Sequence, residues 1–120
     1  MTYVDGFVLA VPKDKIEAYR AMAEKAGKIW KEHGALSFKE NVGEDLSAND
    51  MCTTFPAAFG AKEGEIVVFS FITFKSREHR DEVNAKVMAD ERIQDTCGGD
   101  DMPFDMKRMA YGGFQSIVDL

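Results

Sequence analysis

Residues 66–74 read IVVFSFITF, the strongest strand signal in the chain. It is apolar at both alternating sets of positions, a pattern that is typical of a strand with two covered faces. The stretch therefore predicts a central strand that needs packing partners on both sides of its sheet.

Three further segments are rich in apolar, β-branched and aromatic residues, and they predict strands at 3–11, 36–42 and 108–120. In the second of these segments the alternation with a period of two places Leu36, Phe38 and Val42 on one face. In the last segment, Gly112 and Gly113 indicate a bulge or a close backbone approach.

A first helix is expected directly after the strand at 3–11. Asp14 offers an N-cap, and Glu17 follows three residues later, which is the spacing of a capping box. Gly34 is expected to end the helix. Steps of three and four residues define a stripe along one side of it, formed by Ile16, Tyr19, Ala23, Ala26, Trp30 and His33.

A second helix is expected from a Ser76 cap to about Asp90, with Val83 and Val87 on its inward side. The connections at 43–65 and 91–106 show no clear periodicity and are expected to be loops. The first is far longer than is usual in a compact domain. It therefore predicts a binding loop, a lid or an additional short element.

The resulting order is βαββαβ over a single domain, residues 1–120. It predicts an α+β, ferredoxin-like fold, in which two helices pack on one face of a four-stranded antiparallel sheet. The strand at 66–74 requires burial on both faces, but the helices cover only one. We therefore expect a homodimer whose sheets pack face to face.

The charge balance disfavours several classes of partner. Twenty-one acidic residues against 15 basic ones give a net charge of −6, which repels phosphate backbones, so no nucleic-acid partner is expected. No apolar run approaches the roughly 20 residues that span a bilayer, so no membrane partner is expected. The N-terminus has no basic region of a signal peptide, and a cytoplasmic location is expected.

Neither a metal nor a cofactor is expected. Cys52 and Cys97 match no metal-ligand or redox spacing, and His33 and His79 lie far apart in the sequence. The glycine pairs at 98–99 and 112–113 form no nucleotide-binding pattern. An acidic group lacks the alternating spacing of a calcium loop and is expected to be solvated; it comprises Asp100, Asp101 and Asp105.

Three segments together resemble the YbaA-like family of uncharacterised bacterial proteins, a domain of unknown function within the dimeric α/β-barrel superfamily. They are YVDGFVLAVP at 3–12, VVFSFITFKSREHRDEVNAKVMAD at 67–90 and MPFDMKRMAYGGF at 102–114. The resemblance implies a ferredoxin-like protomer and a dimer whose two sheets form a barrel. It implies no established reaction.

The same superfamily includes cofactor-free monooxygenases, haem-degrading enzymes and isomerases, whose pockets lie between the sheet and its helices. This likeness is one of fold alone. The chain departs from the haem-degrading pattern because its single tryptophan, Trp30, falls on the first expected helix rather than on a strand.

The second expected helix carries the main candidate site residues. Arg80 projects near the stripe of Val83 and Val87, so it needs a carboxylate partner, for which Asp5 and Asp105 are the candidates. One interpretation is a structural ion pair. The other is a polar cluster at a pocket floor, where Arg80 binds an anionic substrate and a second group exchanges protons. The candidates for that cluster are Asp5, His79, Arg80, Asn84 and Tyr111.

Three functions remain open from the sequence. The first is a dimeric protein that binds a small apolar or aromatic molecule. The second is a cofactor-independent enzyme, monooxygenase- or isomerase-like, acting on such a molecule. The third is a structural dimer that recognises a protein partner through residues 43–65, where Phe55 and Phe59 would form an apolar patch.

Overall fold

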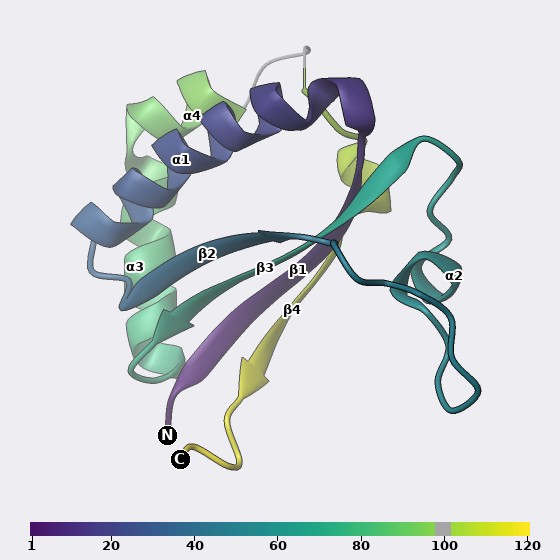
Figure 1. The fold of residues 1–120 in the computed structure, drawn as a ribbon. Coiled ribbons are helices and arrows are strands. Elements are labelled where there is room, and N and C mark those ends of the chain that lie inside the picture. The colour runs from purple at the N-terminus through teal and green to yellow at the C-terminus, as the bar shows by residue number, and fades with distance from the viewer. Residues whose placement is uncertain (98–101) are drawn as a thin grey trace.

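A computed structural model describes residues 1–97 and 102–120. The predicted glycine pair at 98–99 and the predicted acidic residues Asp100 and Asp101 lie outside the described residues. Four antiparallel strands form one sheet in the order β2-β3-β1-β4 (Figure 1). The strands are β1 (Tyr3–Pro12), β2 (Ser37–Val42), β3 (Glu65–Phe74) and β4 (Ala110–Gln115).

Three helices cover one face of this sheet (Figure 1). They are α1 (Ile16–Glu32), α3 (Arg77–Ala89) and α4 (Glu91–Cys97). The predicted α+β fold with its βαββαβ order is confirmed. The core lies between the two layers, where the fully buried side chains include Leu9, Val11, Val68, Phe74, Val83 and Val87.

The start of α1 differs from the prediction. Pro12 ends β1, and a short 3-10 helix, η1 (Lys13–Lys15), follows before α1 begins at Ile16. Asp14 therefore lies inside this turn, and the N-cap position falls to Lys15, whose side chain makes no capping hydrogen bond. The prediction of an Asp14–Glu17 capping box was wrong, because an extra turn of backbone separates the strand from the helix.

The other predicted helix limits agree with the structure. Gly34 has a φ of +114°, a backbone conformation that favours glycine, directly after the α1 C-cap residue His33. The Ser76 side chain caps α3 by accepting a hydrogen bond from the backbone N–H of His79 at 3.1 Å.

Two predicted loops contain short helices. In the connection at 43–65, α2 (Phe55–Phe59) begins after Thr54, whose hydroxyl accepts from the N–H of Ala57. This is the predicted additional element. The prediction of a loop throughout 91–106 was wrong, because this segment begins with α4, and a 3-10 helix, η2 (Met106–Arg108), starts at its last residue. Each is too short to show a helical period in the sequence.

The last strand is shorter than predicted and has no bulge. β4 ends at Gln115, since β1 begins at Tyr3 and offers no further partner beyond the bond from Ser116 N–H to Thr2 O. The register runs without interruption through Gly112 and Gly113. The alternative prediction of a close approach holds at Gly113, where an added Cβ would collide with the Tyr3 side chain.

The second face of the sheet is apolar and largely uncovered in the single chain, although Ala10 and Val67 at one end of it are buried. Strand alternation sends the outward positions of β1 and β3 to this face, and none of them carries a charge: Val4, Gly6, Val8, Ala10, Val67, Phe69, Phe71 and Thr73. Phe69 is 45% exposed, and Phe114 on β4 is 61% exposed. We call these residues, with Phe114, the open face.

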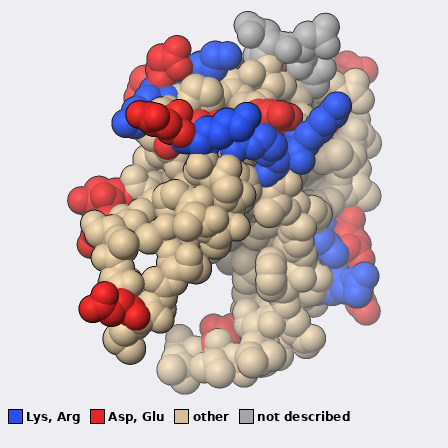
Figure 2. Space-filling view, turned by 90° about the vertical axis from the view of Figure 1, so that its right-hand side faces the viewer, with Lys and Arg blue, Asp and Glu red and all other residues tan. Residues whose placement is uncertain are grey.

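Charged side chains gather over the helix layer in the view from the side of α2, and most of the surface below them is uncharged (Figure 2). Within residues 1–97 and 102–120, no helix is both long enough and apolar enough to cross a bilayer.

Candidate functional site

A cavity of about 600 Å³ lies between the sheet and the helix layer. Half of its lining residues are aromatic or methionine, and a few polar groups lie at its floor and side. The apolar lining includes Phe7, Met22, Trp30, Phe38, Met88, Phe104, Met106 and Met109. Such a wall adapts to a flat apolar molecule, since methionine side chains are flexible and aromatic rings offer large faces.

The floor of the cavity carries a buried carboxylate, Asp5 on β1, which is 1% exposed. Its Oδ1 accepts a hydrogen bond from Arg80 Nη1 at 2.8 Å, and its Oδ2 accepts one from Asn84 Nδ2 at 3.2 Å. Asn84 Oδ1 in turn accepts from Trp30 Nε1 at 3.0 Å. The polar floor therefore connects β1 to both α1 and α3.

Arg80 is held from three further directions. Its Nη1 also donates to the Tyr111 hydroxyl at 3.0 Å, and its Nε donates to Asp81 at 2.8 Å. Its guanidinium carbon lies 4.9 Å from the centre of the Tyr3 ring, a cation–π contact. Partial burial and the nearby Asp5 carboxylate raise the pKa of Tyr111. The side chain of Arg80 is thus consumed in internal contacts.

The structure brings together four of the sequence candidates, namely Asp5, Arg80, Asn84 and Tyr111, but not the other two. His79 faces the turn before α3, where Nδ1 accepts from Lys75 N–H at 3.0 Å and the ring packs edge-on against Phe74. Asp105 caps η2 by accepting from Lys107 N–H. Of the two predicted carboxylate partners of Arg80, Asp5 pairs with it and Asp105 does not.

A second polar group on the cavity wall was not among the candidates. Glu40 on β2 accepts hydrogen bonds at the same oxygen, Oε2, from the Tyr19 hydroxyl at 2.7 Å and the Ser70 hydroxyl at 2.6 Å. Burial raises the pKa of Glu40 above its ordinary value, although these two hydrogen bonds oppose the shift. Burial and the neighbouring carboxylate also raise the pKa of Tyr19.

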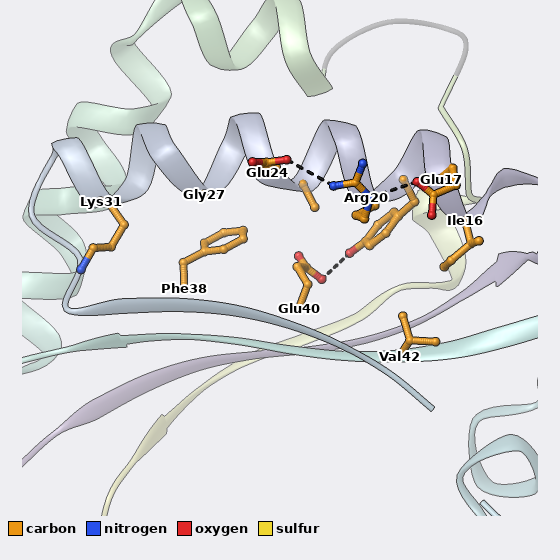
Figure 3. Close-up of a pocket in the computed structure, with 11 residues that line it drawn as sticks. Ile16, Glu17, Arg20, Glu24, Gly27, Lys31, Phe38, Glu40 and Val42 are labelled. Carbon is orange, nitrogen blue, oxygen red and sulfur yellow. Dashed lines mark hydrogen bonds and ion pairs between the residues drawn. The ribbon is translucent and has the colours of Figure 1, made fainter. Parts of the chain in front are cut away.

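Glu40 also lines a groove of about 570 Å³ between α1 and β2 (Figure 3). β2 is an edge strand, so this groove opens at the side of the sheet. The rim carries charged residues of α1, including Arg20, which pairs with Glu17 and Glu24. Glu40 lines both the groove and the cavity, as do Tyr19, Ala23 and Phe38.

One signal in the sequence pointed to Glu40. The alternation that places Phe38 and Val42 on the inward face of β2 places Glu40 on that face too, since it lies midway between them. A carboxylate between two inward apolar residues is the type of residue that needs an internal partner. Tyr19 was predicted to face inward, but its hydroxyl as that partner was not.

Of the remaining titratable candidates, Cys97 lines the cavity, and His33 and Cys52 do not. His33 Nε2 lies 2.8 Å from Asp90 Oδ2, and hydrogen bonds from Arg92 and His33 hold the pKa of Asp90 below its usual range. Cys52 is exposed, while partial burial raises the pKa of Cys97. The described part of the chain contains no group of three or more potential metal-ligating side chains.

The sheet order and the hollow between its layers define the class: this is a ferredoxin-like α+β protein. It is similar in fold to Rv0793 from Mycobacterium tuberculosis, with 13% identity, a TM-score of 0.57 and coverage of 99% of this chain and 98% of that one. It is also similar to a dimeric ferredoxin-like protein from an uncultured marine organism, with 14% identity, a TM-score of 0.57 and full coverage of both chains.

Within this class, the chain belongs to the family described as Protein of unknown function (DUF1428), whose model matches residues 2–106. It is 51% identical over 119 residues to the uncharacterized protein YbaA of Escherichia coli strain K12, covering 99% of each chain. The uncharacterized YbaA protein of Shigella flexneri matches equally well. The predicted resemblance to the YbaA-like family is confirmed.

Proposed function

We propose that this protein binds a small apolar or aromatic molecule in the cavity between its sheet and its helices. The cavity itself carries the proposal, because about 600 Å³ of largely apolar wall is enough for a compact organic ligand. A few polar groups converge on that wall, namely Asp5, Asn84, Glu40 and Ser70. Apolar cavities with few, fixed polar groups are typical of small-molecule sites.

The test uses 2-methoxynaphthalene, a neutral aromatic probe, and the indole N–H of Trp30 as the reporter. Trp30 is the only tryptophan and lines the cavity, so it gives one resolved indole resonance. Titration of ¹⁵N-labelled protein is expected to shift this resonance and the amides of the cavity wall. No shift at millimolar probe would contradict the proposal.

A cavity-filling variant is the matched control. Ala23 is buried on α1 and lines both the cavity and the groove, so Ala23→Leu adds volume inside the site. The variant is expected to keep its circular dichroism spectrum and to bind the probe at least several-fold more weakly. Ala21→Leu, at an exposed position of the same helix, is expected to leave binding unchanged.

We also propose that two copies pair through the open face. An apolar, uncharged sheet face favours a partner with the same character, and two such faces bury each other in an isologous dimer. The fold neighbour described as a dimeric ferredoxin-like protein supports this arrangement. Light scattering at micromolar concentration is expected to give twice the mass of one chain.

Charge substitution on the open face tests this pairing. Phe69→Glu places a carboxylate at the centre of the face and is expected to yield a folded monomer. Lys25→Glu, on an exposed position of α1, changes charge away from that face and is expected to remain dimeric. A dimer that survives Phe69→Glu would show that the copies pair elsewhere.

The alternative of a protein partner at residues 43–65 gains less support. The ring centroid of Phe55 on α2 lies 6.3 Å from that of Phe69, and Phe69 lies 5.9 Å from Phe71. The apolar side chains of this connection therefore extend the open face instead of forming a separate patch. This continuity favours a second copy as the occupant.

The second candidate function is a cofactor-independent isomerase- or monooxygenase-like enzyme that uses the same cavity. Glu40 favours proton transfer, since a carboxylate with a raised pKa on a cavity wall is suited to exchange protons with a bound molecule. The test follows deuterium uptake at the carbon beside the carbonyl of 2-tetralone in D₂O. Equal rates with the wild-type protein and Glu40→Gln would contradict this candidate.

A further inference from the structure

Two carboxylates line the cavity, and they differ in their ion-pair and hydrogen-bond partners. Asp5 is paired with the Arg80 guanidinium and takes a second hydrogen bond from Asn84. Glu40 has no Lys or Arg within ion-pair distance in the part of the chain that the structure describes. Within the described residues, its side chain accepts hydrogen bonds only from two neutral hydroxyls, those of Tyr19 and Ser70.

The hydrogen-bonding capacity of Glu40 is used on one side only. Both hydroxyls donate to Oε2, which leaves Oε1 without a protein donor among residues 1–97 and 102–120. A carboxylate has about four acceptor positions in total. Every fully buried side-chain oxygen in the described residues has a partner, so Oε1 is not fully buried. Glu40 lines both the cavity and the groove, and a ligand can reach Oε1 from this space.

The position of Glu40 is fixed before any ligand arrives. β2 holds its backbone in the sheet, and the two hydroxyls approach from α1 and from β3. Figure 3 shows the carboxylate between the strand and the helix, pointing towards α1. An acceptor that is already oriented binds a donor with little loss of side-chain entropy.

Aromatic side chains line the same cavity as this acceptor. The rings of Trp30 and Phe38 lie 6.1 Å apart, and those of Tyr19 and Phe104 lie 5.6 Å apart with an edge-on geometry. These spacings are those of interacting aromatic pairs. Ring faces and edges of this kind favour a flat, aromatic body in the space next to Glu40.

We propose that the cavity takes a flat aromatic molecule that carries a hydroxyl or N–H group, and that this group donates a hydrogen bond to Glu40 Oε1. The inference rests on the proposed binding function and names its ligand class. Anionic aromatic acids are disfavoured by the same site, because a ligand carboxylate would repel Glu40, and no Lys or Arg of the described residues lies within ion-pair distance of Glu40. Burial that raises the pKa of Glu40 is consistent with a carboxylate short of polar partners.

Three probes with one ring system test the inference by isothermal titration calorimetry in slightly alkaline buffer. 2-Naphthol carries the donor, 2-methoxynaphthalene lacks it, and 2-naphthoate carries a negative charge. The wild-type protein is expected to bind 2-naphthol about tenfold more tightly than 2-methoxynaphthalene, since hydrogen bonds to charged groups are the stronger ones. 2-Naphthoate is expected to bind most weakly.

The Glu40→Gln variant isolates the acceptor. Its amide oxygen still accepts from Tyr19 and Ser70, so the fold is retained, but the charge is gone. The preference for 2-naphthol over 2-methoxynaphthalene is expected to fall several-fold, and 2-naphthoate is expected to bind more tightly than it binds the wild-type protein. Ser70→Ala, which leaves the Glu40 charge in place, is expected to keep the wild-type order of the three probes.

The outcomes separate this inference from the function on which it rests. If 2-naphthol and 2-methoxynaphthalene bind equally well, or if Glu40→Gln leaves their ratio unchanged, the ligand class is wrong while the cavity remains a binding site. Tightest binding of 2-naphthoate would also overturn it. If none of the three probes binds, the proposed binding function fails and the ligand class fails with it.

Discussion

Arg80 on α3 donates to Asp5 on β1 across 2.8 Å, and this contact joins the helix layer to the middle of the sheet. Asp5 is 1% exposed, and the Arg80 side chain is 13% exposed. Both oxygens of the carboxylate are bonded, and the guanidinium also contacts Tyr111 and Tyr3. A pair that is this well enclosed is a structural element of the fold.

Arg80→Ala is expected to lower the free energy of unfolding by about 3 kcal/mol, because it leaves the Asp5 charge buried without its cation. Urea denaturation measures the loss, and the melting temperature is expected to fall with it. Arg77→Ala, at an exposed position of the same helix, is the control and is expected to change stability by less than about 0.5 kcal/mol. Unchanged stability of Arg80→Ala would contradict the structural role of the pair.

The close packing of α1 on β2 depends on a glycine. A Cβ added at Gly27 would lie 2.6 Å from Cδ1 of Phe38, well inside van der Waals contact. Figure 3 shows the Phe38 ring below this position of the helix. Alanine normally stabilises a helix interior by about 1 kcal/mol relative to glycine. Overpacking in a core costs about 1 to 3 kcal/mol, so Gly27→Ala is expected to be destabilising by about 1 kcal/mol.

A second background distinguishes this collision from other causes. In Phe38→Ala protein the ring is absent, so Gly27→Ala is expected to raise the free energy of unfolding by about 1 kcal/mol through helix propensity alone. Thermal or urea unfolding of the wild type, the two single variants and the double variant shows whether Gly27→Ala stabilises or destabilises each background. The same direction in both backgrounds would show that contact with Phe38 is not the cause of the destabilisation.

The fold was predictable because it depends on patterns that a sequence displays directly. IVVFSFITF requires cover on both faces, and the helical stripes and the Ser76 cap mark the elements that cover one of them. The errors lie at elements that are too short to repeat their pattern clearly. A helix of seven residues, such as α4, completes only about two turns. The 3-10 helix at 13–15, which comes before α1, is likewise too short to show a pattern in the sequence.

The candidate site was predictable only in part. The inward position of Arg80 implied a carboxylate, but Asp5 and Asp105 were equally open, since pairing across 75 residues depends on strand register. His79 neighbours Arg80 in sequence, yet adjacent helical residues point about 100° apart, so it faces a different region. Glu40 was not among the predicted site residues, because the strand at 36–42 showed which residues share a face but not which side chain of the helix would meet a carboxylate there.

Glu40 predicts a pH dependence of stability. Its pKa is raised in the folded protein, so the folded state holds its proton more tightly than the unfolded state does. The associated stability is fully present below the ordinary carboxyl pKa of 4.5, and it is lost as the pH rises through the raised value. Ionised Glu40 is therefore a destabilising group at neutral pH.

The measurement compares the free energy of unfolding of Glu40→Gln with that of the wild-type protein across this pH range. The variant is expected to gain stability relative to the wild type as the pH rises from 4.5 to neutral, because glutamine carries no charge to bury. Glu44→Gln, at an exposed position after β2, controls for the loss of one negative charge. A difference that does not change with pH would show that the fold does not raise the pKa of Glu40.

Glu65 at the start of β3 predicts the opposite dependence. Arg108 donates to both of its oxygens, at 2.7 and 2.9 Å, and lowers the pKa of Glu65 to about 2. Stability from this pair is fully present above the ordinary carboxyl pKa of 4.5 and is lost as the pH falls towards 2. Arg108 also donates to Gly60 O, so the pair fixes the connection that carries α2.

Arg108→Gln removes the cation and is expected to lower the free energy of unfolding at neutral pH, with a difference from the wild type that shrinks as the pH falls from 4.5 towards 2. Lys107→Gln, its exposed neighbour, removes the same charge without breaking the bond to Glu65 and is expected to leave stability nearly unchanged. Acid titration of Arg108→Gln and Glu40→Gln therefore distinguishes the environments of Glu65 and Glu40. As the pH falls, Arg108→Gln is expected to lose its lower stability relative to the wild type, and Glu40→Gln is expected to lose its higher stability. Parallel curves for the two variants would contradict the opposite environments assigned to Glu65 and Glu40.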